Sequence, residues 1–186
     1  MAAILGDRLE LVARPADAGE VDETGETLED NARLKARAVA AVADADALAD
    51  DTGLEVEALG GAPGVRSARY AGDTATDADN VRRLLGELTG VTGEGRRARF
   101  RTVVVLHRRD GSELVAEGVV TGRIAEAPRG QGGFGYDPVF VPDEGDGRTF
   151  AEMSAADKNA LSHRGRALRA LLERLDPAAP DGPGGA

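Results

Sequence analysis

Two adjacent aspartates, Asp50 and Asp51, follow an apolar stretch and stand directly before Thr52 and Gly53. Because successive side chains of an extended strand point to opposite faces, only one of the two carboxylates is expected to reach a given cleft. A carboxylate at the end of a strand, beside a glycine that lets a ligand approach, can hold Mg²⁺ while water completes the coordination. Aspartate and glycine also favour turns, and the doublet alone fits a turn between two strands better.

Glu23 offers a second carboxylate shortly before a segment with helical periodicity. Acidic residues are also common in loops that lead into a helix, where they interact with its positive end, so a purely structural role is the alternative. The chain has no cysteine and only two histidines. Any bound metal is therefore expected to have mainly oxygen ligands, which points to Mg²⁺ or Mn²⁺.

The loop 132–138 (GGFGYDP) places Phe134 and Tyr136 among glycines, in a chain that is only 3% aromatic. The glycines leave space around these rings, so a flat ligand can stack on them. Stacking of a base on an aromatic ring contributes roughly 1–3 kcal/mol. A tight turn with both rings in the core is the alternative.

Lys158, His163 and Arg164 bring three cationic or donor side chains within seven residues. Ser162 is expected to cap a helix here, which would hold His163 and Arg164 at a defined position. Arginine is a rigid group with several donors and histidine can donate to a carbonyl, which suits the 6-oxo edge of a purine. Ordinary helix capping with a solvated arginine explains this segment equally well.

Lys35 and Lys158 are the only lysines among 23 basic residues. Where arginine is used almost everywhere else, a retained lysine can mark a site that needs a compact point charge. Chance retention on a solvated surface is an equal alternative.

The periodicity of apolar residues predicts the elements that position these groups. Helices are expected at 27–43, from Thr76 or Asp77 onward, after Ser154 and after Ser162. Strands are expected at 47–58 with a break at the aspartate doublet, at 98–106, at 113–124 after an Asp-Gly hairpin signal, and at 139–141. Helices together with a hairpin and separate strands predict an α/β fold with a mixed sheet.

The 186 residues suit a single domain with a sizeable core. A formal net charge of −10 opposes non-specific binding to DNA or RNA, which requires a basic surface, although a small anion can still bind locally. No apolar run approaches the roughly 20 residues of a membrane helix, and no signal-peptide pattern is present. A cytoplasmic protein without a membrane or nucleic-acid partner is therefore expected.

Five sequence blocks, taken together and in order, resemble the non-canonical purine nucleoside triphosphate pyrophosphatases, also called the inosine/xanthosine triphosphate pyrophosphatase family. The resemblance covers nearly all of residues 20–175. The blocks are ETGETLEDNARLKA (23–36), ADDTGLEVEALGGAPGVRSARYAG (49–72), DN (79–80), GGFGYDPVF (132–140) and K-x-x-x-SHRG-x-AL (158–168).

The resemblance implies a catalytic role for Asp51, as general base and Mg²⁺ ligand, with Glu23 as the second acidic residue at the metal. Thr52 stands where the family commonly has serine, and Lys35 is implied to reach the phosphates. The other substrate-binding residues that the resemblance implies are Phe134, Gly135, Tyr136, Asp137, Lys158, His163 and Arg164.

The family fold implied by this resemblance is an elongated mixed sheet flanked by helices, with a nucleotide cleft between two lobes and assembly as a homodimer. Residues 1–176 would form this two-lobed domain, and the Pro- and Gly-rich segment 177–186 is predicted to be a disordered tail. The family pattern starts with an apolar strand and an Asn-x-x-Lys phosphate loop that this sequence lacks. Weakened or absent turnover is expected on that account.

The implied reaction is attack of water on the α-phosphorus of inosine, deoxyinosine or xanthosine triphosphate (ITP, dITP or XTP), with Mg²⁺ neutralising charge and pyrophosphate leaving. Donors that face position 6 accept the oxygen of hypoxanthine or xanthine and penalise the amino group of adenine. Two alternatives stay open. One is a related pyrophosphatase for modified pyrimidine or 7-methylated nucleotides, and the other is a catalytically impaired nucleotide-binding or dimerisation module.

Overall fold

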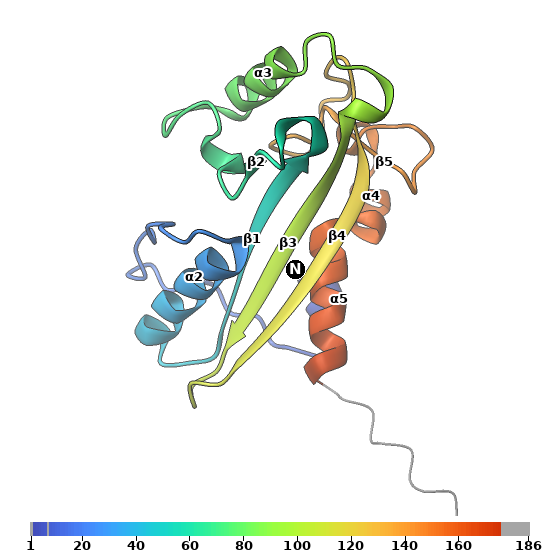
Figure 1. Ribbon diagram of the computed structural model, residues 1–186. Coiled ribbons are helices and arrows are strands. Elements are labelled where there is room, and N and C mark those ends of the chain that lie inside the picture. The colour runs from blue at the N-terminus through green and yellow to red at the C-terminus, as the bar shows by residue number, and fades with distance from the viewer. Residues whose placement is uncertain (1, 7, 176–186) are drawn as a thin grey trace, which may run out of the picture.

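A long antiparallel hairpin forms the centre of the protein, which a computed structural model describes for residues 2–6 and 8–175 (Figure 1). It belongs to a five-stranded sheet in the order β2-β1-β3-β4-β5. The strands are β1 (Ala47–Val56), β2 (Pro63–Gly64), β3 (Arg97–His107), β4 (Glu113–Ile124) and β5 (Phe140–Pro142). The predicted tail at 177–186 lies outside the described residues.

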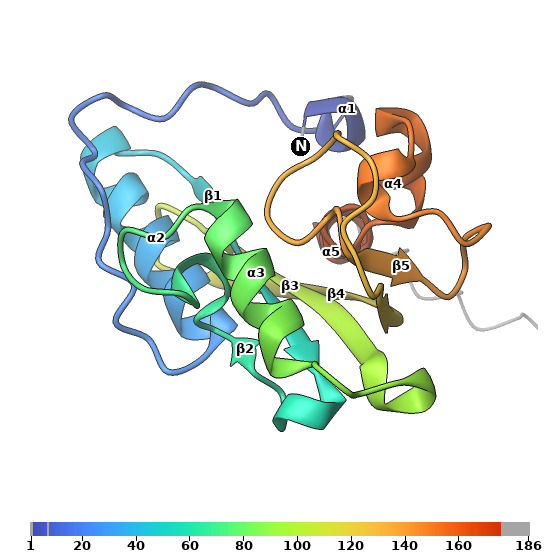
Figure 2. The same ribbon diagram turned by 90° about the horizontal axis from the view of Figure 1, so that it is seen from above.

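Helices cover both faces of the sheet, which confirms the predicted α/β class (Figure 2). The sheet differs from the predicted mixed arrangement in that all four strand pairs among the described residues are antiparallel. The physical reason lies in the connections. The Asp110-Gly111 hairpin returns β4 beside β3, and the segment between β1 and β3 also brings the chain back in the opposite direction.

The predicted break at the aspartate doublet is wrong, because β1 runs without interruption through it. Asp50 lies opposite Val104 and Gly53 opposite Arg101 in a regular register with β3. Gly53 serves close approach instead of a turn, since a Cβ atom there would lie 2.7 Å from the carbonyl oxygen of Gly64 in β2. The doublet therefore belongs to a strand, and its two side chains must alternate.

Four helices begin where the sequence predicts them: α2 (Leu28–Ala43), α3 (Asp77–Glu87), α4 (Ala155–Leu161) and α5 (His163–Leu175). The short helix α1 (Ala2–Leu5) was not predicted. The hydroxyls of Thr27, Thr76 and Ser154 each accept a hydrogen bond from a backbone N–H of the first helical turn, at 3.1–3.2 Å. Ser162 caps α5 in the same way at 3.1 Å. Among the described residues, no helix combines the length and apolar character that a membrane span requires.

Apolar side chains gather at both ends of the three long strands. At the end near α3, β5 and α4, the large members of the core cluster are Leu54, Phe100, Phe140 and Phe150. Towards the other end, α5 packs on Val104 and Leu106 on one face of the sheet. On the opposite face, α2 packs on Val103 and Val105. One continuous set of strands thus connects two regions of core.

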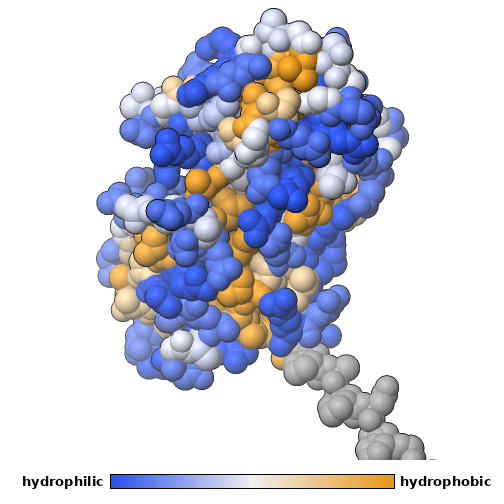
Figure 3. Space-filling model, viewed as in Figure 1, coloured by the Kyte–Doolittle hydropathy of each residue, from blue (hydrophilic) through white to orange (hydrophobic). Residues whose placement is uncertain are grey.

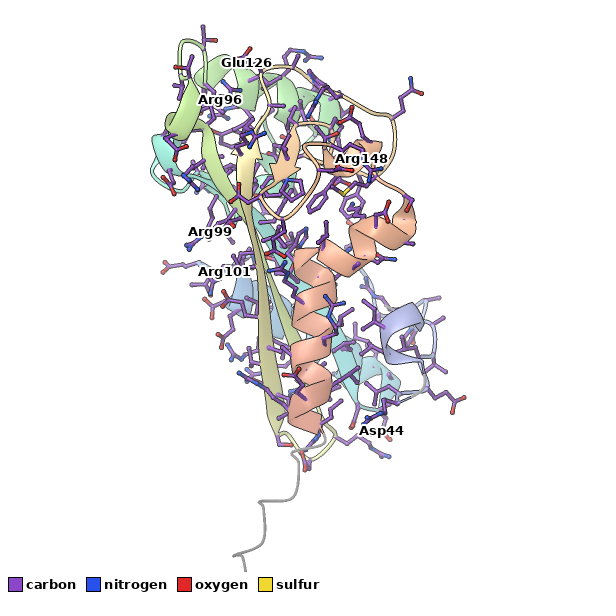
Figure 4. All side chains as sticks on the ribbon, turned by 90° about the vertical axis from the view of Figure 1, so that its right-hand side faces the viewer. Asp44, Arg96, Arg99, Arg101, Glu126 and Arg148 are labelled. Atoms are coloured by element: carbon purple, nitrogen blue, oxygen red, sulfur yellow. The ribbon has the colours of Figure 1, made fainter. Side chains whose placement is uncertain are left out.

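Arg96 fastens α3 to the sheet. Its buried guanidinium donates four hydrogen bonds, of 2.7–3.2 Å, to the backbone carbonyls of Ile124, Ala125, Leu88 and Val91. The following arginines of β3 behave differently, because alternation turns Arg99 and Arg101 to the side of the sheet away from α5 (Figure 4). There they pair with glutamates of the neighbouring strands.

Candidate functional site

The aspartate doublet serves two different faces of the sheet, as strand alternation predicts. Asp51 points towards α2, where its carboxylate accepts hydrogen bonds from Lys35 Nζ at 2.7 Å and from Asn31 Nδ2 at 3.4 Å. Asp50 points towards α5 and forms an ion pair with Arg164, whose Nε and Nη2 atoms lie 2.9 and 2.8 Å from its Oδ2 atom. The two carboxylates therefore have different partners on different elements.

A carboxylate–lysine centre forms around Asp51. Lys35 Nζ also donates to Glu23 Oε1 at 3.1 Å, so one ammonium group bridges both predicted metal-site carboxylates. Arg69 holds Glu23 from the other side through an ion pair of 3.0 Å. The structure thus brings together three residues that the sequence predicted for one site. Arg69 was missed, although it lies in one of the blocks that carry the family resemblance.

Asn31 is the second residue of this centre that the sequence did not single out. It is fully buried, and its Oδ1 atom accepts a hydrogen bond from the backbone N–H of Gly25 at 2.8 Å while its amide donates to Asp51. Its spacing of four residues from Lys35 places both on one face of α2, which is the signal that points to it. Asn31 ties the loop that carries Glu23 to the strand that carries Asp51.

Burial and charge act on the two titrating groups in opposite directions. Burial raises the pKa of the Asp51 carboxyl, and the Lys35 ammonium only partly offsets this effect. For Lys35, burial lowers the pKa, but the Asp51 and Glu23 carboxylates outweigh it and the net direction is upward. Lys35 accordingly remains a cation, and Asp51 binds protons more readily than an exposed aspartate.

A cavity of about 450 Å³ opens beside this centre. Its walls include Glu23, Lys35, Asp50 and Arg14, and it follows the outer edge of β1. Among the described residues, no other strand pairs with that edge between Ala47 and Gly53. The cavity is lined by two cations, Arg14 and Lys35, and by three carboxylates, those of Glu20, Glu23 and Asp50. Carboxylates beside a lysine suit a phosphate group that enters together with a divalent cation.

A second cavity, of about 370 Å³, lies on the α5 side of the sheet and contains the predicted base-binding residues Phe134, Lys158, His163 and Arg164. Phe134 is 59% exposed, and its ring lies 4.6 Å from Lys158 Nζ and 5.7 Å from Arg164 Cζ. The two cations lie over the ring and hold it in place, and because more than half of Phe134 is exposed, a flat ligand can still reach the ring. The structure therefore brings the glycine-rich loop and the segment after Lys158 into one pocket.

Three predicted residues of the glycine-rich loop lie outside the lining of this pocket. Tyr136 is buried in the core and donates from its hydroxyl to the carbonyl of Ser67 at 2.9 Å, while the N–H of Gly135 donates to Asp77 at 2.7 Å. Asp137 is also buried, and it accepts hydrogen bonds from Lys158 and from the N–H of Phe134. Asp137 thus orients two pocket residues from below.

His163 is held beneath the pocket by residues of the sheet. Its Nδ1 atom lies 2.6 Å from the hydroxyl of Thr102, which in turn lies 2.7 Å from the hydroxyl of Thr52, and its ring stacks on Phe100 at 4.6 Å. Burial, followed by the charges of Arg164 and Lys158, lowers the pKa of His163 to about 3. The imidazole is therefore neutral near pH 7. Thr102 carried no signal in the sequence, because only the folded sheet brings it to His163.

The ion pair of Asp50 and Arg164 connects the two cavities, since Asp50 lines the first and Arg164 lines the second. An α/β protein that joins a lysine–carboxylate centre to an aromatic pocket is suited to a ligand with phosphates at one end and a flat base at the other. The sequence profile of the Ham1 family matches residues 1–174. The chain belongs to the Ham1 family.

Curated relatives agree with this assignment and confirm the predicted resemblance. The dITP/XTP pyrophosphatase of Symbiobacterium thermophilum is 49% identical over 179 residues, which cover 96% of this chain and 89% of the relative. The enzyme of the same name from Shigella flexneri is 49% identical over 181 residues, covering 94% of this chain and 90% of that protein.

Solved structures of the family share the fold. The HAM1 protein from Coxiella burnetii has a TM-score of 0.79 and 43% identity, covering 87% of this chain and 83% of that chain. The nucleoside-triphosphatase, or dITP/XTP pyrophosphatase, from Mycobacterium abscessus has a TM-score of 0.70 and 46% identity, covering 92% of this chain and 83% of that one.

The donor set around Asp51 fits a magnesium ion that binds together with a phosphorylated ligand. Within the described residues, no group of three or more histidine, cysteine or acidic side chains could hold a metal by itself. Asp51 and Glu23 nevertheless converge on one cation, the ammonium of Lys35. Magnesium is commonly held by one or two carboxylates, with water and substrate phosphates supplying the other ligands. Two carboxylates are sufficient for that mode of binding.

Proposed function

We propose that this protein hydrolyses non-canonical purine nucleoside triphosphates, namely ITP, dITP and XTP, to the monophosphate and pyrophosphate. The observation that carries the proposal is the pair of linked cavities, with Lys35 and Asp51 beside one and Phe134, Lys158 and His163 in the other. The names of the Ham1 relatives support the same activity. Neither these relatives nor the described residues favour a binding module without turnover.

Asp51 is proposed to act as the general base of this reaction. It accepts a proton from water as the water oxygen attacks the α-phosphorus, and the bond from that phosphorus to the bridging oxygen breaks with pyrophosphate leaving. The raised pKa of Asp51 increases its proton affinity, while Lys35 keeps a positive charge beside it. The same lysine can exchange a carboxylate partner for a phosphate oxygen when the triphosphate enters.

Magnesium is the proposed cofactor, with Asp51 and Glu23 as the residues that would hold it. When bound, it would neutralise charge on the phosphates and on the departing pyrophosphate. The role of this chain is to place two carboxylates where they share one cation, and Asn31 and Arg69 fix their positions.

The base is proposed to stack on Phe134, with His163 and Arg164 as donors towards position 6. An oxygen at position 6 accepts from these donors, whereas the amino group of adenine would leave them unpaired. With these donors in place, we expect the pocket to bind hypoxanthine and xanthine in preference to adenine, as the sequence predicted.

Pyrophosphate release from ITP, XTP and ATP tests the proposed function. With Mg²⁺, we expect kcat/KM for ITP and XTP to exceed that for ATP by about 100-fold or more, because the wrong group at position 6 leaves polar groups unpaired. Removal of divalent metal with EDTA should abolish release, and added Mg²⁺ should restore it. Equal rates for ITP and ATP, or release that is insensitive to EDTA, would contradict the proposal.

We further propose that the protein is a homodimer, and that residues 1–176 act as one two-lobed domain in the cytoplasm, where nucleoside triphosphates are found. Support for self-association comes from the face of β4 that α5 leaves uncovered, where half-buried Val119 lies beside the ion pair of Glu117 and Arg101. Val115 on the same face packs partly against the core cluster under α2. Figure 3 shows apolar surface along the sheet on this side, bordered by hydrophilic residues. Apolar side chains between charges of both signs suit a self-complementary interface. Sedimentation should give twice the 19.2 kDa mass of the chain, and a monomer at micromolar concentration would contradict it.

A further inference from the structure

Two consecutive hydrogen bonds link three buried or half-buried side chains, from the sheet to the base pocket. Thr52 of β1 lies 2.7 Å, oxygen to oxygen, from Thr102 of β3, and Thr102 lies 2.6 Å from Nδ1 of His163 at the start of α5. Thr102 is fully buried and His163 is 5% exposed. Contacts this short inside a protein are hydrogen bonds whose donors and acceptors must be accounted for.

The neutral imidazole of His163 has one N–H, and the protein decides which ring nitrogen carries it. Nδ1 faces Thr102. Within the described part of the chain, every fully buried polar side-chain atom has a hydrogen-bond partner. No partner is found there for Nε2, so this atom is not fully buried, and His163 lines the pocket beside Phe134 and Arg164. Nε2 is accordingly the atom that can meet a ligand.

The number of available protons fixes which group donates and which accepts in each of these two hydrogen bonds. If Thr52 donates to Thr102 and Thr102 donates to Nδ1, both hydroxyl protons are used and Nδ1 is the acceptor. If Nδ1 donated instead, the bonds would run the other way, and the Thr52 hydroxyl would need a further acceptor. None is found for it among the described residues, so only water could accept from the half-buried Thr52. The first direction satisfies all three groups within the protein, and it places the imidazole proton on Nε2.

We propose that Thr102 is a positioning residue that fixes His163 in the Nε2–H tautomer and thereby sets its selectivity for a carbonyl over an amino group. The inference rests on the proposed function for its consequence, because a donor at Nε2 pairs with a 6-oxo purine. The other tautomer would present an acceptor, which pairs with the 6-amino group of adenine. Thr102 is fully buried and lines neither cavity, so it would select between 6-oxo and 6-amino purines only through the position of the proton on His163.

The test compares Thr102→Val, which has nearly the same shape but no hydroxyl, with Thr102→Ser, which keeps the hydroxyl. In ¹⁵N-labelled protein without nucleotide, long-range ¹H–¹⁵N NMR reports which imidazole nitrogen is protonated. The chain has only two histidines, so His107→Gln assigns the signals. We expect a single Nε2–H tautomer in the wild type and in Thr102→Ser, and a mixture of tautomers in Thr102→Val.

The ratio of kcat/KM for ITP to that for ATP should fall about tenfold in Thr102→Val, chiefly through KM, because one oriented hydrogen bond is lost. Thr52→Val should cause a smaller loss, since Thr102 can still donate to Nδ1. Thr102→Ser should retain the wild-type ratio. Thermal unfolding of each variant separates this effect from a general loss of stability.

An unchanged tautomer in Thr102→Val would overturn the inference, as would an Nδ1–H wild type or a lower melting temperature with the ITP to ATP ratio intact. Failure of the wild type to hydrolyse ITP would overturn the proposed function instead. The NMR measurement needs no turnover, so the two failures are distinguishable.

Discussion

Asp51→Asn is expected to lower kcat for ITP hydrolysis by about a thousandfold, while the Kd for ITP changes by less than about threefold. The amide keeps the size of the side chain and can still accept from Lys35, but it cannot take a proton from the attacking water. Single-turnover kinetics measures the chemical step, and isothermal titration with the same variant measures binding.

The neighbouring Asp50→Asn is the matched control, because it makes the same chemical change on the opposite face of β1. Asp50 holds Arg164 by an ion pair and has no contact with Lys35 among those found in the described residues. We expect this variant to raise KM for ITP severalfold and to lower kcat by less than tenfold. If Asp50→Asn reduced kcat as much as Asp51→Asn does, the assignment of the base to Asp51 would be wrong.

Lys158→Met is expected to lower the free energy of unfolding by about 3 kcal/mol, because removing one partner of a buried ion pair leaves a charge without compensation. The side chain of Asp137 is 3% exposed, and besides Lys158 its carboxylate contacts only the N–H of Phe134 among the hydrogen bonds found. Equilibrium denaturation in urea measures the loss. The same variant should bind ITP more weakly, since Lys158 lines the base pocket.

Two further variants separate the buried charge from other effects of the substitution. Adding Asp137→Asn to Lys158→Met removes the uncompensated carboxylate and should recover at least about half of the lost stability. Arg82→Met on α3 breaks an exposed ion pair with Asp79 and should leave the denaturation midpoint close to that of the wild type. A midpoint for Lys158→Met that matched Arg82→Met would show that the Lys158–Asp137 pair does not stabilise the protein.

The elements of the fold were predictable wherever local chemistry determines them. The caps Thr27, Thr76 and Ser154 precede apolar periodicity, and all three begin helices in the structure. The aspartate doublet misled the strand prediction because its residue types favour turns. Pairing with β3 overrides that preference, and Gly53 is required for the approach of Gly64.

Most individual residues of the site were predictable from the sequence, but only some of the contacts between them were. Strand alternation correctly separates Asp50 from Asp51. The sequence could not show that Phe134 faces the pocket and Tyr136 enters the core, since both aromatics stand two residues apart in the same glycine-rich loop. Thr102 and Arg69 act through contacts with residues 61 and 46 positions away in the chain, and no local pattern reports such contacts.

Hydrolysis of ITP in ¹⁸O-labelled water tests the central claim most directly. If Asp51 activates water for attack on the α-phosphorus, the label must appear in inosine monophosphate, and the pyrophosphate must remain unlabelled. Mass spectrometry of the two products distinguishes the possibilities in a single reaction. Label in the pyrophosphate, or formation of inosine diphosphate with labelled inorganic phosphate, would contradict the proposed reaction.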